Sequence, residues 1–256
     1  MQRQEHGWAR RSRIDDFIPR SVHSRRRALE QIHAIDWEEH TPEETLEFAL
    51  EYFGRKIAMA TAFGLEGMVL LDMIAKRWPN TQVFWVDTQL FFPETYELIE
   101  RAQERWDLDW IRVLPGESPD EQSLRLGRDL FRSDSDACCQ NRKVEPLRAF
   151  LRDRGLDAWI TSLRRGQSAS RANTPIAHVD PVFGLIKFNP LARWSSEQVH
   201  DYIREHDVPT NVLHERGYPS VGCRPCTRAV IPGQDERSGR WAGSCKTACG
   251  LHRGNG

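Results

Sequence analysis

The sequence predicts an α/β fold in which helices flank a parallel sheet. Short apolar runs, typical of buried strands, alternate with helical patterns of about ten or more residues. This alternation is typical of parallel strands joined by crossover helices. The chain has 256 residues, of which 39% are hydrophobic and 29% charged, so one or two soluble domains with a buried core are expected.

The first half of the chain contains three strand-and-helix units. Residues 25–35 are a candidate helix in a peripheral stretch. Thr41 is a predicted N-cap, followed by Pro42 at the first helical position, and this helix is expected to end at Gly54. Strands are then predicted at 57–62, 82–87 and 110–114, and helices at 68–78 and 94–106.

The second half is less regular. Residues 115–137 are polar, and a helix is expected to follow and to end near Gly155. A strand is predicted at 158–162, an edge strand or extended segment at 186–191, and a helix from Ser195 or Ser196 to Glu205. We expect three parts: a peripheral segment over 1–40, an α/β domain over 41–235 and a C-terminal tail over 236–256.

Composition and charge exclude several classes of protein. A net charge of −1 argues against general nucleic-acid binding. The chain contains no apolar run of about 18 residues, so no membrane span is expected. The charged N-terminus does not resemble a signal peptide, so we expect a cytoplasmic protein. Disulfides are rare there, and the six cysteines are therefore expected to be ligands or reactive thiols.

Polar residues follow the predicted strands where a parallel sheet binds its ligands. The turn 61–67 could bring backbone N–H groups to a phosphate, or it could be an ordinary strand-to-helix turn. Asp87 and Thr88 could bind a ribose or purine, or could form a capping pair. The basic loop 163–171 favours a bound anion over a solvated loop. The candidate residues are Thr61, Gly64, Asp87, Thr88, Arg164, Arg165 and Arg171.

The cysteines provide the strongest chemical signal. Cys138 and Cys139 are adjacent, and Cys223 and Cys226 form a Cys-x-x-Cys pair. Zinc sites commonly combine two Cys-x-x-Cys pairs, whereas adjacent cysteines can reach two irons of one cluster. An iron–sulfur cluster with four thiolates is therefore favoured over zinc and over buried free thiols. Cys249 lies near Lys246 and His252, which favour a thiolate; the alternative is an idle thiol on a tail.

These segments together resemble the assimilatory adenylylsulfate (APS) reductase family, over residues 57 to 252. The segments 138–147 and 214–228 resemble the two cysteine motifs of this family. The segments 237–241 and 249–252 resemble its C-terminal signature. Val86-Asp87-Thr88, with Pro93 to Tyr96, resembles its Leu-Asp-Thr segment.

The resemblance implies an adenine-nucleotide hydrolase-like fold related to ATP pyrophosphatases. It implies a [4Fe–4S] cluster held by Cys138, Cys139, Cys223 and Cys226. It further implies reduction of APS to sulfite and AMP, in which Cys249 attacks the sulfate sulfur and forms an S-sulfonate. Thioredoxin or glutaredoxin would then release sulfite by thiol exchange. The oligomeric state stays open, a homo-oligomer included.

Attack on an oxidised sulfur requires cations, because anionic oxygens surround that atom. Lys143, next to the cluster cysteines, is one candidate. The resemblance implies that Arg237, Arg240 and His252 contact the phosphosulfate. Arg164, Arg165 and Arg171 are then expected to line the remaining anion loop.

The sequence departs from the family pattern at several positions. Ala248 replaces the usual Glu before the nucleophile, Gly166 stands where an acid is common, and the turn 61–67 lacks a hydroxyl and an acid. Cys245 is an additional thiol that could reach Cys249, although an incidental thiol is the favoured interpretation. The alternatives are a 3′-phosphoadenylylsulfate (PAPS) reductase or a dual APS/PAPS reductase, a cluster-bearing tRNA-thiolating enzyme, and a non-catalytic iron–sulfur or zinc module.

Overall fold

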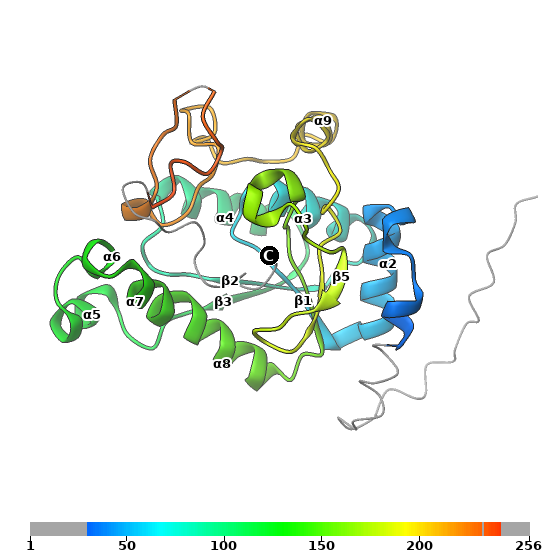
Figure 1. Cartoon of the computed structure of the whole chain (residues 1–256), viewed down its shortest axis with the longest axis horizontal. Coiled ribbons are helices and arrows are strands. Elements are labelled where there is room, and N and C mark those ends of the chain that lie inside the picture. The colour runs from blue at the N-terminus through cyan, green and yellow to red at the C-terminus, as the bar shows by residue number, and fades with distance from the viewer. Residues whose placement is uncertain (1–29, 232, 242–256) are drawn as a thin grey trace, which may run out of the picture. The chain divides into compact units, whose positions relative to one another are not determined.

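A computed structural model describes residues 30–231 and 233–241 (Figure 1). The chain divides into two units between Asp36 and Trp37. In the first unit, residues 30–34 are helical, within the range that the sequence indicates. All elements named below belong to the second unit.

A six-stranded sheet forms the centre of this unit, in the order β3-β2-β1-β4-β6-β5. Neighbouring strands are parallel except for β5 and β6, and this arrangement confirms the predicted α/β class. The strand β5 was not predicted, since its three residues form no apolar run. The strands are β1 (Ile57–Ala60), β2 (Gln82–Val86), β3 (Asp109–Val113), β4 (Ala158–Ile160), β5 (Ala177–Val179) and β6 (Ile186–Phe188).

Helices cover both faces of the sheet. Figure 1 shows α3 and α4 on one side of the sheet and α8 on the other. The helices are α2 (Pro42–Phe53), α3 (Leu65–Arg77), α4 (Pro93–Arg105), α5 (Pro119–Leu126), α6 (Leu130–Ser133), α7 (Ser135–Cys139), α8 (Glu145–Arg154) and α9 (Ser196–Glu205). The short helical turns are η1 (Trp37–Glu39), η2 (Gly54–Lys56), η3 (Gln140–Val144, a π-helix), η4 (Arg165–Gln167), η5 (Ala169–Arg171) and η6 (Arg224–Cys226).

Local sequence explains where these helices begin. Thr41 caps α2, and its Oγ1 accepts a hydrogen bond from the backbone N–H of Glu44 at 3.2 Å. Ser195 caps α9 in the same way, through the backbone N–H of Gln198 at 3.1 Å. Each cap satisfies a donor that the first helical turn leaves unpaired. Both predicted N-caps are therefore confirmed.

The core on the α8 face joins four strands to one helix. Ala58, Phe84, Val113 and Trp159, from β1 to β4, are buried against Leu147 and Leu151 of α8. Burial of a leucine side chain contributes about 1.5–3 kcal/mol to folding. This packing fixes α8, and with it the turn η3 that precedes it, against one face of the sheet.

The strand order reverses between β1 and β4. From β1 the chain adds β2 and then β3 toward one edge of the sheet, and it returns to add β4 on the other side of β1. The strands β1 and β4 are therefore neighbours in the sheet, although they are not consecutive in sequence. The carboxyl ends of two such strands border a crevice, which is the usual ligand site of an open parallel sheet. In the ranges that the structure describes, every helix is too short or too polar to span a lipid bilayer.

Candidate active site

A cavity lies at this reversal point. Thr61 and Ala62 follow β1, and Thr161 to Leu163 follow β4, so both strand ends contribute to the lining. Its charged residues are Lys143, from η3, and Arg240, from the C-terminal segment. The remaining wall is largely apolar and is formed by Ala60, Phe84, Trp85, Val86, Phe91, Thr95, Leu147, Trp159, Val221 and Gly222. An apolar pocket with a few convergent polar groups is typical of a nucleotide or cofactor site.

The turn after β1 is built around Thr61. Its Oγ1 accepts a hydrogen bond from the backbone N–H of Phe63 at 3.0 Å. Phe63 has a φ of 56°, in the left-handed region, and its ring is buried against Trp85 and Trp110. Gly64 caps α3 and faces open space. The free N–H groups of the first turn of α3 thus lie at the carboxyl end of β1, as the sequence predicts.

Asp87 and Thr88 lie outside the cavity lining. Asp87 is fully buried, and it accepts hydrogen bonds from Arg112 Nε at 2.8 Å, Tyr96 Oη at 2.8 Å and the backbone N–H of Gln89 at 2.7 Å. In this structure Asp87 therefore organises the end of β2. Burial, followed by the hydrogen bond to Asp87, raises the pKa of Tyr96 to about 12.

Replacement of Tyr96 by Phe is expected to change how stability depends on pH. The pKa of Tyr96 is raised on folding, so its contribution is present below the unfolded pKa of about 10 and is lost as the pH rises through about 12. Wild type should thus lose more unfolding free energy than Tyr96→Phe between pH 10 and 12, as measured by urea unfolding. Parallel pH profiles of the two proteins would contradict this assignment.

Four cysteines converge beside the cavity. Cys138 and Cys139 end α7, Cys223 directly precedes the turn η6, and Cys226 is the last residue of that turn. Burial raises the pKa of Cys138, and the nearby thiols of Cys139 and Cys223 raise it further. Burial, followed by Cys223, also raises the pKa of Cys226 to about 11, with Cys139 and Cys138 contributing. The two predicted pairs, 84 or more residues apart in sequence (223 − 139 = 84), are therefore within electrostatic reach of each other.

Hydrogen bonds from a buried arginine and from the second cysteine segment tie both cysteine segments to the end of β2. Arg142 is 1% exposed and donates from Nε to the carbonyl oxygen of Thr88 at 2.7 Å. The Oγ1 atom of Thr88 lies 3.2 Å from the sulfur of Cys223. The backbone N–H of Arg224 donates to the carbonyl oxygen of Leu90 at 2.7 Å. These bonds hold η3 and η6 on the same strand end, and the two cysteine pairs with them.

The four cysteines provide thiol donors, the ligand type that iron–sulfur clusters take. Within residues 30–231 and 233–241, no three His, Cys, Asp or Glu side chains are placed to hold one ion. A four-iron cluster bonds each cysteine to a different iron atom, so its ligands surround the cluster and do not meet at one point. Cys138, Cys139 and Cys223 are buried, and burial raises the pKa of Cys138, an effect that the nearby cations Lys143 and Arg142 partly offset.

Arg240 faces the cavity from a tightly packed position. Its Nη1 donates to the carbonyl oxygen of Val221 at 3.2 Å and to Ser220 Oγ at 3.3 Å, and its guanidinium lies 4.8 Å from the ring centre of Trp241. A Cβ atom at Gly222 would lie 2.1 Å from Nη2 of Arg240. Any other residue at position 222 would therefore require the Arg240 guanidinium to shift from this position. The structure thus brings together Thr61, Lys143 and Arg240 of the predicted site.

The other predicted arginines do not line the cavity. Arg164 is buried and pairs with Glu66 at 3.2 Å. Arg165 pairs with Glu38 at 3.0 Å. The remaining two have polar protein partners: Arg171 donates to Gln167 Oε1 and Arg237 to Ser220 Oγ. In this structure, the arginines of the basic loop 163–171, which was expected to hold an anion, therefore contact other side chains of the protein.

Several residues of the cavity were missed. Trp159, Thr161 and Ser162 lie at the end of β4, and Phe91 lies in the segment after β2. Their position at the strand reversal could have identified them as cavity residues. The sequence, however, does not show which strands are neighbours in the sheet. The predicted nucleophile Cys249, together with Cys245 and His252, lies outside the described residues.

Comparison with known proteins is consistent with this geometry. Residues 56–229 match the family model described as "Phosphoadenosine phosphosulfate reductase domain". An adenosine 5′-phosphosulfate reductase of Salinibacter ruber is 46% identical over 217 residues, which cover 84% of this chain and 85% of the relative. A phosphoadenosine 5′-phosphosulfate reductase of Gloeobacter violaceus is 44% identical over 222 residues, covering 86% of this chain and 91% of the relative.

A solved structure has the same fold. The crystal structure of a PAPS reductase from Candida auris, described as a phosphate complex, superimposes with a TM-score of 0.66 at 32% identity. The match covers 83% of this chain and 99% of that protein.

Proposed function

This chain belongs to the family of PAPS and APS reductases, and from that premise we propose that it reduces APS to sulfite and AMP in sulfate assimilation. The observation that carries the proposal is the position of Lys143. This residue follows the first cysteine pair in η3 and also lines the cavity at the strand reversal. The four-thiol site and the cavity at the strand reversal thus share one cation.

The proposed chemistry takes place in two steps. The thiolate of Cys249 attacks the sulfur of APS, an S–S bond forms, and the bond from sulfur to the phosphate oxygen breaks with its electron pair, so that AMP leaves. A thiolate of thioredoxin or glutaredoxin then attacks the sulfur of Cys249 and displaces sulfite. A second thiol of the reductant resolves the mixed disulfide. The dithiol loses two electrons and becomes a disulfide, and the sulfate sulfur is reduced to sulfite.

The cavity supports this transfer electrostatically. Its walls are largely apolar, which suits an adenine ring, and its two cationic side chains are Lys143 and Arg240. These cations stabilise the charge that develops on the phosphate oxygen as AMP leaves, and they reduce the repulsion between the incoming thiolate and the sulfate oxygens. Their charges match the two negative charges of the phosphosulfate group of APS.

We propose that Cys138, Cys139, Cys223 and Cys226 hold a [4Fe–4S] cluster. When bound, this group supplies a fixed charge distribution beside the substrate and does not carry the electrons of turnover. A cytoplasmic setting fits both a thiol reductant and four reduced cysteines.

PAPS reduction is the second candidate, because relatives from Gloeobacter violaceus and Candida auris carry that name. PAPS has an additional 3′-phosphate, and no third cation lines the cavity among the described residues. We therefore expect sulfite release from APS to exceed that from PAPS by at least about tenfold in kcat/KM, a difference of about 1.4 kcal/mol.

The experiment compares both nucleotides on anaerobically purified protein with thioredoxin as reductant. Equal or greater activity with PAPS would contradict the APS assignment. Absence of sulfite from both nucleotides, in protein that contains iron and sulfide, would favour a non-catalytic cluster module or a tRNA-thiolating enzyme.

A further inference from the structure

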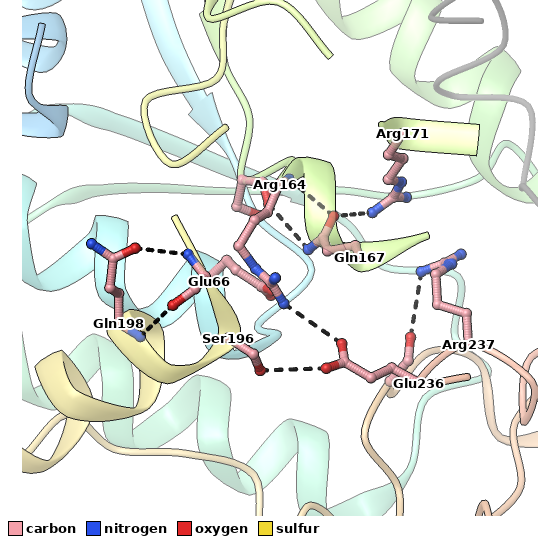
Figure 2. A network of polar contacts seen from close by, with 11 residues as sticks. Glu66, Arg164, Gln167, Arg171, Ser196, Gln198, Glu236 and Arg237 are labelled. Atoms are coloured by element: carbon pink, nitrogen blue, oxygen red, sulfur yellow. Dashed lines mark hydrogen bonds and ion pairs between the residues drawn. The ribbon is translucent and has the colours of Figure 1, made fainter. Parts of the chain in front are cut away.

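A polar network joins the basic loop to the C-terminal segment, defined here as residues 233–241 (Figure 2). Arg164 lies at its centre, and its side chain is 4% exposed. Its Nε lies 3.2 Å from Glu66 Oε1, and its Nη2 lies 3.6 Å from Glu236 Oε2. Ser196, at the start of α9, donates from Oγ to Glu236 Oε1 at 3.3 Å. One buried guanidinium therefore connects α3, the segment after β4 and the C-terminal segment.

The residues around Arg164 accommodate this conformation of its side chain. Arg164 is also held through its backbone, whose N–H donates to Gln167 Oε1 at 3.1 Å. A Cβ atom at position 166 would lie 2.6 Å from Nη1 of Arg164. Gly166 thus leaves the room that the guanidinium occupies between its two carboxylates. Gly166, a departure from the family pattern, in which an acid is common at this position, therefore belongs with this arrangement.

The network joins residues next to two lining residues of the cavity. Leu163 lines one wall and directly precedes Arg164, whereas Arg240 lines the other and follows Glu236 by four residues. The C-terminal segment is held at its far end as well, since the backbone N–H of Trp241 donates to the carbonyl oxygen of Cys226 at 2.9 Å. The segment is therefore anchored at one end beside the cluster cysteines and at the other on Arg164.

We propose that Arg164 and Glu236 are positioning residues that fix the C-terminal segment, and with it Arg240, across the cavity from the end of β4. Cys249 follows Trp241 by eight residues, so the same anchor sets the point from which the nucleophile reaches the substrate. This inference rests on the proposed reductase function. It assigns to the basic loop a role in holding the segment that precedes the catalytic thiol in sequence, in place of anion binding by Arg164.

The test is the single-turnover transfer of the sulfo group to Cys249, measured with saturating APS and without reductant. Glu236→Gln is the principal variant, because Glu236 is 44% exposed and its replacement leaves the fold intact. We expect the transfer rate to fall about tenfold, within the range that displacement of a reacting group costs. The Kd for APS should change less than about threefold, since the lining residues remain.

Two further variants separate positioning from general damage. Glu38→Gln removes the carboxylate that pairs with the neighbouring Arg165 and leaves the C-terminal segment untouched, so it should transfer at the wild-type rate. In an Arg164→Met background, Glu236→Gln should have no additional effect, because the pair is already broken. If Arg164→Met does not fold, the comparison of Glu236→Gln with Glu38→Gln decides alone.

The outcomes are distinct. A wild-type rate in Glu236→Gln, or an equal loss in Glu38→Gln, would overturn the positioning role while leaving the reductase function intact. Failure of the wild-type protein to form any adduct with APS would overturn the reductase function, and the positioning role with it.

Discussion

Cys249→Ser is expected to reduce kcat for sulfite release from APS by at least about 10³-fold. A serine hydroxyl is a far weaker nucleophile than a thiolate at neutral pH, and a sulfate ester on the serine oxygen has no S–S bond that a thiol could cleave to release sulfite. The four cluster cysteines are separate from this position in sequence, so iron and sulfide contents should equal those of wild type. Sulfite release with thioredoxin, together with metal and sulfide analysis of the same preparation, measures both quantities.

Cys245→Ser is the matched control, because it makes the same substitution four residues earlier in the chain. It should keep wild-type turnover, since Cys245 is interpreted as an incidental thiol. Turnover that survives in Cys249→Ser, or that is lost equally in Cys245→Ser, would contradict the assignment of the nucleophile.

Cys223→Ser is expected to have the second largest effect, through loss of the cluster. Cys223 is 5% exposed, and its sulfur lies 3.2 Å from Thr88 Oγ1, so the site cannot easily recruit another ligand. We expect iron content below about half of the wild-type value, turnover reduced by about 100-fold and a lower melting temperature, because metal binding contributes folding free energy.

The measurement is iron and sulfide per chain after anaerobic purification, followed by thermal unfolding. Cys245→Ser again provides the control, with unchanged iron and an unchanged melting temperature. Full iron content in Cys223→Ser, or zinc in the wild-type protein, would contradict the cluster assignment.

Local patterns made much of the fold predictable. Thr41 and Ser195 identified helix starts, and the apolar runs identified five of the six strands. The run at 186–191 was expected to be an edge strand or extended segment, whereas β6 lies between β4 and β5. Alternation of strands and helices gave the parallel class. The strand β5 (Ala177–Val179) was missed because it is short and follows a polar loop, and its pairing with β6 depends on tertiary contacts that a short run does not reveal.

The part of the candidate site that is marked by residue spacing could be predicted from the sequence. The roles of residues that depend on their hydrogen-bond and ion-pair partners were harder to predict. The two cysteine pairs were recognisable from sequence, and the structure brings them together. Arg164 and Asp87 were selected as ligand contacts because of their residue types, yet here Glu66 and Glu236 engage the first and Arg112 and Tyr96 the second. Such pairings join residues about 9 to 98 positions apart, which no local pattern indicates.

The most direct test of a tethered thiol as nucleophile is mass analysis of wild-type protein incubated with APS in the absence of reductant. The peptide that contains Cys249 should gain one sulfo group, in an amount equal to the AMP released, and thioredoxin should then remove that group as sulfite. Release of AMP and sulfite with no adduct on this peptide, or an adduct on Cys245 alone, would contradict the central role of Cys249.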